Sequence, residues 1–508
     1  MSNFRWVISA LLLLATTVNY MDRQVLSLTW KDFIAPDFGW TNDHYGTITG
    51  WFSIFYAIAN LFAGKFIDWM GTKKGYLIAI FVWSLGACLH AVCGWAAVGI
   101  ASFVAISLTT ISVYLFLACR LILAVGEAGN FPAAIKVTAE YFPKKDRAFA
   151  TSIFNSGASV GALAAPATIP LLARAWGWEM AFIIIGALGF IWMGLWMWLY
   201  EKPHKSDRVN QAELNYIEQD SDIADVQNKQ EAKAEKTISL WGCFKFKQTW
   251  SFIVGKLMTD GVWWFFLFWA PAYFSAQYGY TSDSSMGIAL IFTLYAIVTI
   301  LSIGGGYLPK YFVESRGMNP YLGRMRAMLI FAFFPLLGLL AQPLGAYSAW
   351  WPAILIGLLG AGHQAWSANL FSTIGDMFPK STIGSITGIG SMAGGLGSFA
   401  INKGSGKFFD WAAGSFSFDG KTFVMNRENI EKAFDLAKGT IEPGTTASDM
   451  AQLVADQGGQ ILTSPWAAMG FEGEPAAYMV VFSICSVAYL IGWCIMKALV
   501  PKYKPVIA

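Results

Sequence analysis

Residues 64–74 read GKFIDWMGTKK, a short basic stretch that lies between two apolar runs of the chain. A weaker copy, GYLPKYFVESRG, stands in the second part of the chain at residues 306–317. A second pair of copies, FPK at 142–144 and at 378–380, keeps nearly the same offset. Internal repetition of this kind is typical of membrane carriers built from two related halves, with the binding site between them near the midplane. The stretch therefore predicts a duplicated architecture.

The composition places both halves in a membrane. The chain has 508 residues, of which 56% are hydrophobic and 13% charged, against roughly 25% charged in a soluble domain. Continuous apolar runs exclude an outer-membrane barrel, whose strands alternate, and a net charge of +3 does not indicate a nucleic-acid partner. We therefore expect an all-α polytopic membrane protein with 12 transmembrane helices in two six-helix pseudo-symmetric halves. Its spans lie near residues 6–28, 46–67, 76–96, 107–138, 148–172, 178–200, 250–276, 286–308, 324–342, 349–376, 384–409 and 477–499.

Lysine and arginine in the short loops predict the orientation, because such residues collect on the cytoplasmic side. Two of them, Lys31 and Arg174, fall on one side of the membrane. Fourteen fall on the other: Lys65, Lys73, Lys74, Lys144, Lys145, Arg147, Lys310, Arg316, Arg324, Arg326, Lys380, Lys497, Lys502 and Lys504. We therefore expect both termini in the cytoplasm and a multi-pass protein of the bacterial inner membrane.

The spans divide the chain into three parts. We expect an N-terminal six-helix half over 1–200, a polar cytoplasmic linker over 201–247 and a C-terminal six-helix half over 248–508. The C-terminal half carries a periplasmic insertion at about 411–475, which has nine acids against four bases and a helical-looking piece from Arg427 to Lys438. This insertion is either a tolerated loop or an external sieve or partner surface.

Metal and redox chemistry lack their usual signatures. The six cysteines show no metal or disulfide spacing, and the four histidines are scattered. No serine and histidine arrangement of a hydrolase is present in the spans. We expect neither a cofactor nor a metal, and a carrier instead of an enzyme.

Several motifs resemble known carriers. The stretches at 64–74 and 306–317 resemble the loop signature of the major facilitator superfamily. NYMDR at 19–23, and Arg120 followed by EAGNFP at 127–132, resemble its anion:cation symporter family. The chain most resembles the hexuronate (glucuronate and galacturonate) branch, except in the 411–475 insertion and in extra residues near 95–110. The motifs that carry this match are YFPKKDR at 141–147, WEMAF at 178–182, DGVWWF at 260–265 and HQAWSAN at 363–369.

Ionisable side chains near the middle of the spans are few. Each costs about 2.5 to 3.5 kcal/mol at the bilayer centre, so it should be paired or functional. They are Asp22 and Arg23 in the first span, Arg120 and Glu127 in the fourth, Lys256 and Asp260 in the seventh, and the titratable His363 in the tenth. The three acids and three bases cancel, so protonation of an acid leaves a base free to hold a carboxylate.

The resemblance assigns roles to four of these residues. It implies proton coupling at Asp22 and Glu127 and anion binding at Arg23 and Arg120. Each pair has a structural alternative: Asp22 and Arg23 can form a static ion pair, and Glu127 can merely anchor Arg120. Lys256 and Asp260 stand four residues apart and can form an intrahelical pair, or they can bind substrate.

The remaining candidates are neutral groups in the spans or charges in the loops. Tryptophan faces stack on sugar rings, and uncharged polar groups bind sugar hydroxyls or hold helices together. We assign substrate contacts to Tyr56, Asn155, Trp264, His363, Gln364, Ser367 and Asn369, besides Lys256 and Asp260. Asp68, Lys73 and Lys74 are assigned to a cytoplasmic gate.

These residues together favour one function. We expect a proton-coupled symporter that imports a hexuronate or a related sugar-acid anion by alternating access. The partners would be a small anionic sugar, protons and the lipid bilayer, and we expect a monomer. An organophosphate or dicarboxylate exchanger of the same fold is the alternative, although phosphate would favour bases without matched acids.

Overall fold

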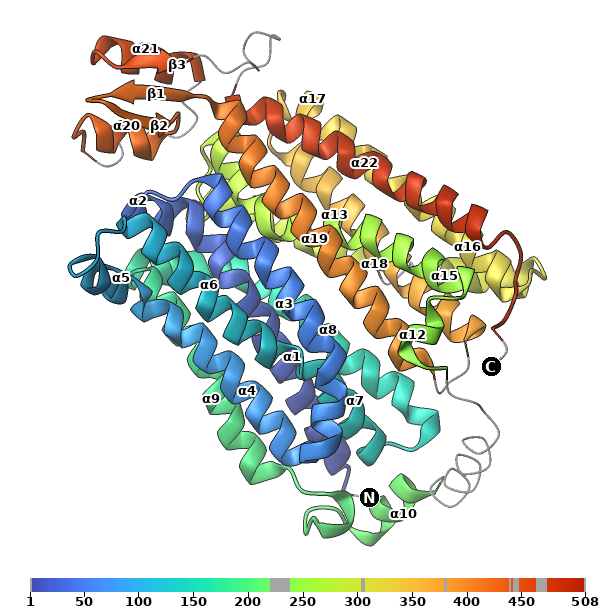
Figure 1. Cartoon of the computed structure of the whole chain (residues 1–508). Coiled ribbons are helices and arrows are strands. Elements are labelled where there is room, and N and C mark those ends of the chain that lie inside the picture. The colour runs from blue at the N-terminus through green and yellow to red at the C-terminus, as the bar shows by residue number, and fades with distance from the viewer. Residues whose placement is uncertain are drawn as a thin grey trace.

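A computed structural model describes residues 2–219, 238–302, 307–378, 382–437, 440–441, 447–462 and 473–506. Within this part of the chain, ten helical segments are long and apolar enough to cross a membrane. Two further helices of 28 and 31 residues, α18 and α19, lie alongside them (Figure 1). The protein is therefore a multi-pass α-helical membrane protein, as the apolar runs predict.

The long helices form two bundles (Figure 1). We call the helices from α1 to α9 the N-terminal bundle and those from α12 to α22 the C-terminal bundle. The long helices of the first are α1 (Phe4–Thr29), α3 (Asn42–Met70), α4 (Thr72–Leu89), α6 (Leu108–Glu127), α8 (Lys144–Trp176) and α9 (Trp178–Leu199). Those of the second are α13 (Lys247–Tyr278), α14 (Ser285–Ser302), α16 (Pro320–Ala332), α18 (Trp350–Met377), α19 (Ile383–Ala413) and α22 (Gly473–Leu499).

Shorter helices extend or connect the long ones. In the N-terminal bundle these are α2 (Ala35–Phe38), α5 (Cys93–Ala101) and α7 (Asn130–Tyr141), and a π-helical turn at Trp30–Ile34 joins α1 to α2. In the chain, α10 (Gln211–Glu218) follows the N-terminal bundle, and α12 (Leu240–Cys243) begins the C-terminal bundle. The C-terminal bundle adds α15 (Tyr307–Lys310) and α17 (Ala341–Gly345).

A small folded cap stands between α19 and α22. Its three short strands are β1 (Ser415–Phe418), β2 (Lys421–Val424) and β3 (Gln460–Leu462), which form an antiparallel sheet in the order β2-β1-β3. Its helices are α20 (Arg427–Ala433) and α21 (Ala447–Asp456). The helix expected from Arg427 thus ends at Ala433, and Lys438 lies outside the described residues. Phe416, Ile430 and Val454 form the small core of the cap.

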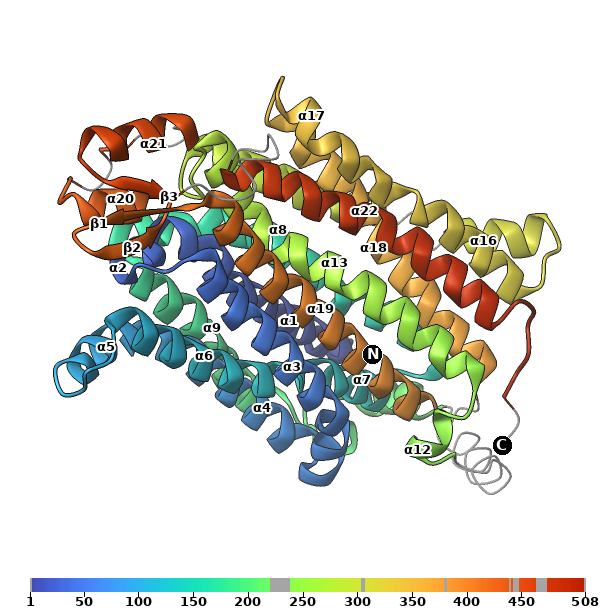
Figure 2. The same ribbon diagram turned by 45° about the horizontal axis from the view of Figure 1, so that its top comes forward.

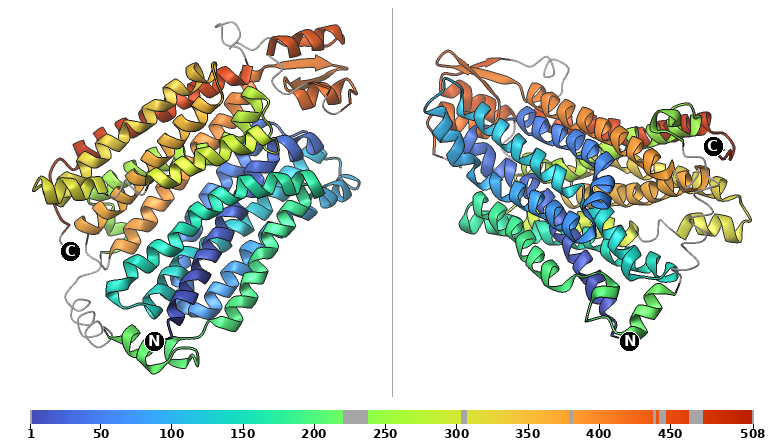
Figure 3. Two further views of the ribbon diagram at one scale, coloured as in Figure 1. Left: turned by 180° about the vertical axis from the view of Figure 1, so that it is seen from behind. Right: turned by 60° about the horizontal axis from the view of Figure 1, so that its bottom comes forward.

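The cap and the two chain termini mark opposite ends of the bundles (Figures 1 and 3). We call these ends the cap side and the terminal side. Figure 2 shows that α3 and α19 run beside each other where the two bundles meet. Glycine permits this approach, because a Cβ at Gly46 would lie 2.5 Å from the carbonyl oxygen of Asn402.

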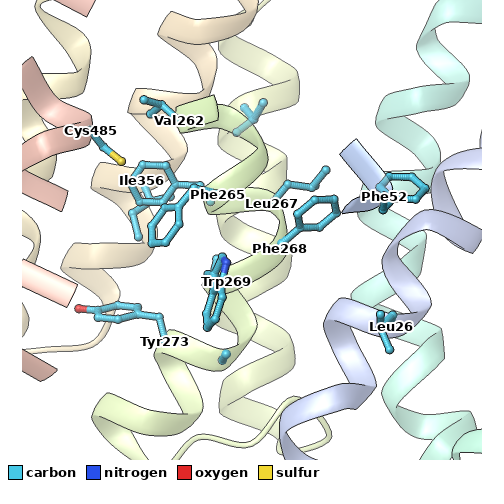
Figure 4. Packing of buried hydrophobic residues seen from close by; sticks show 14 of the residues in the cluster. Leu26, Phe52, Val262, Phe265, Leu267, Phe268, Trp269, Tyr273, Ile356 and Cys485 are labelled. Atoms are coloured by element: carbon cyan, nitrogen blue, oxygen red, sulfur yellow. The ribbon is translucent and has the colours of Figure 1, made fainter. Parts of the chain in front are cut away.

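Aromatic side chains fill the core of the C-terminal bundle. On α13, Phe265 and Trp269 stack with ring centroids 6.2 Å apart, and both are fully buried. Figure 4 shows Phe265 on the side of Ile356 and Cys485, whereas Leu267 and Phe268 of the same helix point toward Phe52 of the other bundle. The ring of Trp269 meets that of Tyr45 in α3, with centroids 5.0 Å apart. The helix α13 is therefore apolar on more than one face and is positioned from both bundles.

Candidate functional site

The two bundles enclose a cavity of about 290 Å³ near their middle. Its walls come from both bundles, and the lining includes polar, charged and aromatic groups, as in sites for small polar ligands. The lining comprises Tyr20, Arg23, Ser53, Tyr56, Ala57, Asn60, Phe131, Lys256, Asp260, Trp263, Trp264, Leu267, His363, Gln364, Ser367, Phe371, Ser391 and Gly395.

A second cavity of about 670 Å³ adjoins the first and shares Tyr20, Trp263 and Gln364 with it. It continues toward the terminal side, where Ile135 of α7 and Ser302, the last residue of α14, line it. The central cavity is therefore approached from the terminal side.

Arg23 brings a positive charge to the wall of the central cavity. Its Nε and one terminal nitrogen donate to the same oxygen of Glu127, at 3.0 and 2.7 Å, and both side chains are buried. The guanidinium also lies 4.6 Å from the ring centre of Tyr56 and 5.0 Å from that of Trp264. These aromatic faces support the cation on the side of the cavity.

Two further mid-span charges of the N-terminal bundle, Arg120 and Asp22, lie behind this wall. Arg120 donates a hydrogen bond to the carbonyl oxygen of Arg23 at 3.0 Å and is 2% exposed. Asp22 is 1% exposed, and neither of its oxygens has a hydrogen-bond partner of ordinary geometry among the described residues. Neither residue lines the cavity. The geometry gives Arg120 a supporting position beneath Arg23, whereas the family resemblance implies anion binding for it.

The C-terminal bundle contributes an ion pair of its own. Nζ of Lys256 lies 2.5 Å from Oδ2 of Asp260 within α13, and 4.6 Å from the ring centre of Phe371. All three residues line the cavity. The expected intrahelical pair is thus present, and it faces the same space as Arg23.

His363 completes the charged and titratable part of the lining. Its Nδ1 lies 2.6 Å from the hydroxyl of Tyr489, and its ring stacks on Trp263 with an interplanar angle of 4°. The imidazole is therefore fixed in orientation by two neighbours, with one edge toward the cavity.

The neutral candidates divide into three groups. Tyr56, Trp264, Gln364 and Ser367 line the central cavity. Asn155 lines the second cavity only. Asn369 is buried, donates to the carbonyl oxygen of Ala365 at 2.8 Å and lines neither cavity. Serine and tyrosine positions that the sequence did not single out, Tyr20, Ser53 and Ser391, also line the central cavity.

The predicted gate residues lie at the terminal side within the N-terminal bundle. Asp68 pairs with Lys136 at 2.8 Å, and Lys73 pairs with Glu201 at 2.8 Å. Lys74 is exposed. These ion pairs hold the loop between α3 and α4 against α7 and the end of α9.

Two carboxylates that the sequence analysis missed close the cap side. Asp32 of the N-terminal bundle accepts hydrogen bonds from the hydroxyl of Ser275 at 2.6 Å and from the backbone N–H of Ser282 at 2.8 Å. Reciprocally, Asp410 of the C-terminal bundle accepts the backbone N–H groups of Asn42 and Asp43, at 2.9 and 2.8 Å. Each acid stands at the end of an apolar run. At such a position the sequence does not distinguish a carboxylate exposed to water from a carboxylate that binds the other bundle.

Deeper between the bundles the contacts continue. The hydroxyls of Ser53 and Ser398 lie 2.7 Å apart, and the Tyr45 hydroxyl donates to the carbonyl oxygen of Phe268 at 2.8 Å. The bundles therefore touch from the cap side down to the level of the cavity. Among the described residues, no three histidine, cysteine, aspartate or glutamate side chains are placed to hold a metal ion.

Solved structures share this fold. A crystal structure of a bacterial homologue of the human lysosomal transporter Spinster matches with a TM-score of 0.64 and 19% identity over 99% of both chains. The xylose transporter XylE from Escherichia coli, in a partially occluded inward-open conformation, matches with a TM-score of 0.59 and 15% identity, over 97% of this chain and 98% of that one.

Sequence relatives extend the comparison. The chain is 26% identical to a hexuronate transporter of Escherichia coli (strain K12), over 79% of this chain and 87% of that protein. It is 26% identical to a galacturonate transporter of Dickeya chrysanthemi, over 63% and 86%. A probable galactarate/D-glucarate transporter of Escherichia coli (strain K12) is 27% identical over 63% and 70%. The family model of the Major Facilitator Superfamily matches residues 12–401. The chain therefore belongs to the Major Facilitator Superfamily, whose members are transporters and not enzymes.

Proposed function

We propose that this protein is a proton-coupled symporter that imports a hexuronate or a related sugar-acid anion by alternating access. The observation that carries the proposal is the pair of Arg23 and Glu127, because it sets a buried cation at the wall of a cavity between two bundles. A guanidinium binds a carboxylate through two parallel hydrogen bonds. The relatives named for hexuronate and galacturonate transport support a substrate of this chemistry.

Charge balance supplies the coupling. In the structure Glu127 accepts hydrogen bonds from Nε and one terminal nitrogen of Arg23. Protonation of Glu127 weakens that ion pair and frees the guanidinium for the substrate carboxylate. A monoanion that enters with one proton adds no net charge to the cavity. Asp22 is buried, and no described residue provides a counter-charge in hydrogen-bond contact with it, so it is the second candidate coupling acid.

The neutral lining would hold the sugar. Trp264 offers an aromatic face, and Tyr56, Gln364 and Ser367 offer hydrogen-bonding groups. A mixture of one charged anchor and several neutral polar groups suits an anionic sugar, because each buried hydroxyl requires a partner. A carrier of organophosphate would need more cationic groups without matched acids.

The location follows from the loop charges. We propose that the protein lies in a bacterial inner membrane as a monomer, with both termini and the 201–247 linker in the cytoplasm and the cap in the periplasm. In this orientation the central cavity faces inward and the Asp32 and Asp410 contacts close its periplasmic side. Alternating access then requires these contacts to break while Asp68, Lys73 and Lys74 take part in closing the cytoplasmic side.

Uptake into proteoliposomes tests the proposal. Labelled glucuronate and galacturonate should accumulate when the outside is acidic, and dissipation of the pH gradient with a protonophore should abolish the accumulation. Accumulation driven by a sodium gradient would contradict proton coupling. Obligatory exchange for internal phosphate or dicarboxylate, without net uptake, would favour the exchanger alternative.

A further inference from the structure

We infer that Lys256 forms a second anion site, so that the preferred cargo is a sugar acid with a carboxylate at both ends of a six-carbon chain. This inference rests on the proposed function and narrows its substrate class. The feature that suggests it is the presence of two separate pairs of a base and an acid in one cavity. One pair, Arg23 and Glu127, belongs to the N-terminal bundle, and the other, Lys256 and Asp260, belongs to the C-terminal bundle.

The two cations face one space from different bundles. Both Arg23 and Lys256 line the central cavity, and their side chains are 5% and 7% exposed. Burial at this depth costs several kcal/mol per ion unless each charge is compensated. An intrahelical pair that only stabilised α13 could lie on any face of that helix. The pair of Lys256 and Asp260 instead lines the cavity between the bundles.

The contacts of the two cations place them at different levels along α13. The guanidinium of Arg23 lies against the ring of Trp264, and the ammonium of Lys256 lies against Asp260, four residues earlier on the same helix. One turn of helix separates these two levels by about 6 Å along the axis of α13. Arg23 would hold the carboxylate at the cap-side end, and Lys256 the carboxylate nearer the terminal side.

Neutral groups of the same cavity suit the hydroxyls of such a molecule. Gln364 and Ser367 line the cavity and supply hydrogen-bonding groups for secondary hydroxyls. The ring of Phe371 lies 4.6 Å from Nζ of Lys256 and offers the ammonium an aromatic face beside the cavity.

The charge balance also favours a dianion. Each acid that takes up a proton releases one cation, so two protons release two. A dianion entering with two protons leaves the cavity neutral, just as a monoanion does with one. A hexuronate would engage Arg23 alone and leave the ion pair of Lys256 and Asp260 in place. The second pair therefore discriminates between the two classes of sugar acid.

Binding to the purified full-length protein in nanodiscs tests this inference. The probes are galactarate, which has two carboxylates, and galacturonate, which has one, titrated by calorimetry. The variants are Lys256→Gln and, as a matched control at an exposed position outside the cavity, Lys65→Gln. We expect Lys256→Gln to weaken galactarate binding about tenfold or more, while galacturonate binding changes less than about threefold. Lys65→Gln should change neither affinity.

Equal loss for both ligands, or no loss for either, would overturn the second anion site, because the lysine would then act on the fold or not at all. If the wild type binds neither ligand and accumulates neither in vesicles, the proposed function itself fails, and that result is distinct from a failure of selectivity. If the Lys256→Gln variant does not insert into the membrane, the Asp260→Asn variant is titrated with the same two ligands. Removal of the competing carboxylate should strengthen galactarate binding at neutral pH and leave galacturonate binding nearly unchanged, and the opposite selectivity would contradict the inference.

Discussion

Arg23 donates two hydrogen bonds to one oxygen of Glu127, while the second oxygen of that carboxylate is buried without a hydrogen-bond partner among the described residues. The ion pair therefore uses two nitrogens of the guanidinium but only one of the two carboxylate oxygens. The negative charge of this buried carboxylate is stabilised mainly by Arg23, and its second oxygen adds no hydrogen bond to offset the cost of burial. Under the proposed function, this carboxylate would release Arg23 when a substrate carboxylate bonds the guanidinium through both of its oxygens.

Replacement of Glu127 tests its role in coupling. In Glu127→Gln, the amide cannot release or bind a proton, so transport down a gradient should persist while accumulation driven by an imposed pH gradient disappears. The measurement compares counterflow exchange of labelled galacturonate with its pH-driven uptake in the same proteoliposomes. Glu179→Gln, at the start of α9 and outside the cavity, is the control. Undiminished accumulation in Glu127→Gln would remove this residue from the coupling mechanism.

Replacement of Arg23 tests the shape of the cation. Arg23→Lys keeps the positive charge but loses the planar pair of donors, so we expect the affinity for galacturonate to fall about tenfold or more. Arg120→Lys should have a smaller effect, because Arg120 contacts the backbone of Arg23 and does not line the cavity. Calorimetry on both variants measures the difference. A larger loss in Arg120→Lys than in Arg23→Lys would contradict this order.

The helical membrane fold could be predicted from the sequence, because apolar runs and loop charges can be recognised in short stretches of residues. It also singled out the charges near mid-membrane, since a buried charge stands out in an apolar run. It could not tell which of these charges reach the cavity. Arg120 and Glu127 lie seven residues apart on one helix, yet Glu127 pairs with Arg23 of α1 whereas Arg120 lies beneath the backbone of α1. Such differences depend on how helices pack, which residue spacing does not specify.

The contacts on the cap side could not be predicted for a related reason. Asp410 accepts the first N–H groups of α3, a helix more than 360 positions away in the chain. It thus fulfils the role of a helix N-cap from the opposite bundle. An N-cap is normally recognised because the capping residue directly precedes its helix. Here the capping carboxylate comes from another part of the chain, so no pattern in the residues next to α3 predicts it.

Loss of this contact should open the cap side. In Asp410→Asn one acceptor oxygen and the negative charge are lost, and a cap of this kind contributes about 0.5–2 kcal/mol. We expect the population that is open on the cap side to rise severalfold. The measurement is labelling of a cysteine at Ala57, in the cavity wall, by an impermeant maleimide added on the cap side, in a background without native cysteines. Asp419→Asn, on the turn between β1 and β2, should leave the rate unchanged, and equal rates in both variants would refute the role of Asp410.

The last prediction concerns pH and the N-terminus. Glu213 of α10 is fully buried and accepts the backbone N–H groups of Phe4 and Arg5, at 3.0 and 3.1 Å, together with the Arg5 side chain at 3.1 Å. Burial alone would raise the pKa of Glu213, but these hydrogen bonds and that of Ser2 outweigh it and hold the pKa below its ordinary value. The carboxylate thus fixes the first turn of α1, where a negative charge is favourable.

The sign of the pH effect follows from this direction. Because folding lowers the pKa of Glu213, its stabilising contribution is present above the pKa of the unfolded chain, about 4.3, and is lost as the pH falls through the folded-state value. Glu213→Gln should therefore melt at a lower temperature than the wild type at pH 7, by an amount that corresponds to about 1–3 kcal/mol. The gap should narrow as the pH is lowered below about 4. Thermal unfolding of both proteins across this range measures the gap, and a gap that is constant or that widens toward acid would show that the charge of Glu213 does not stabilise the start of α1.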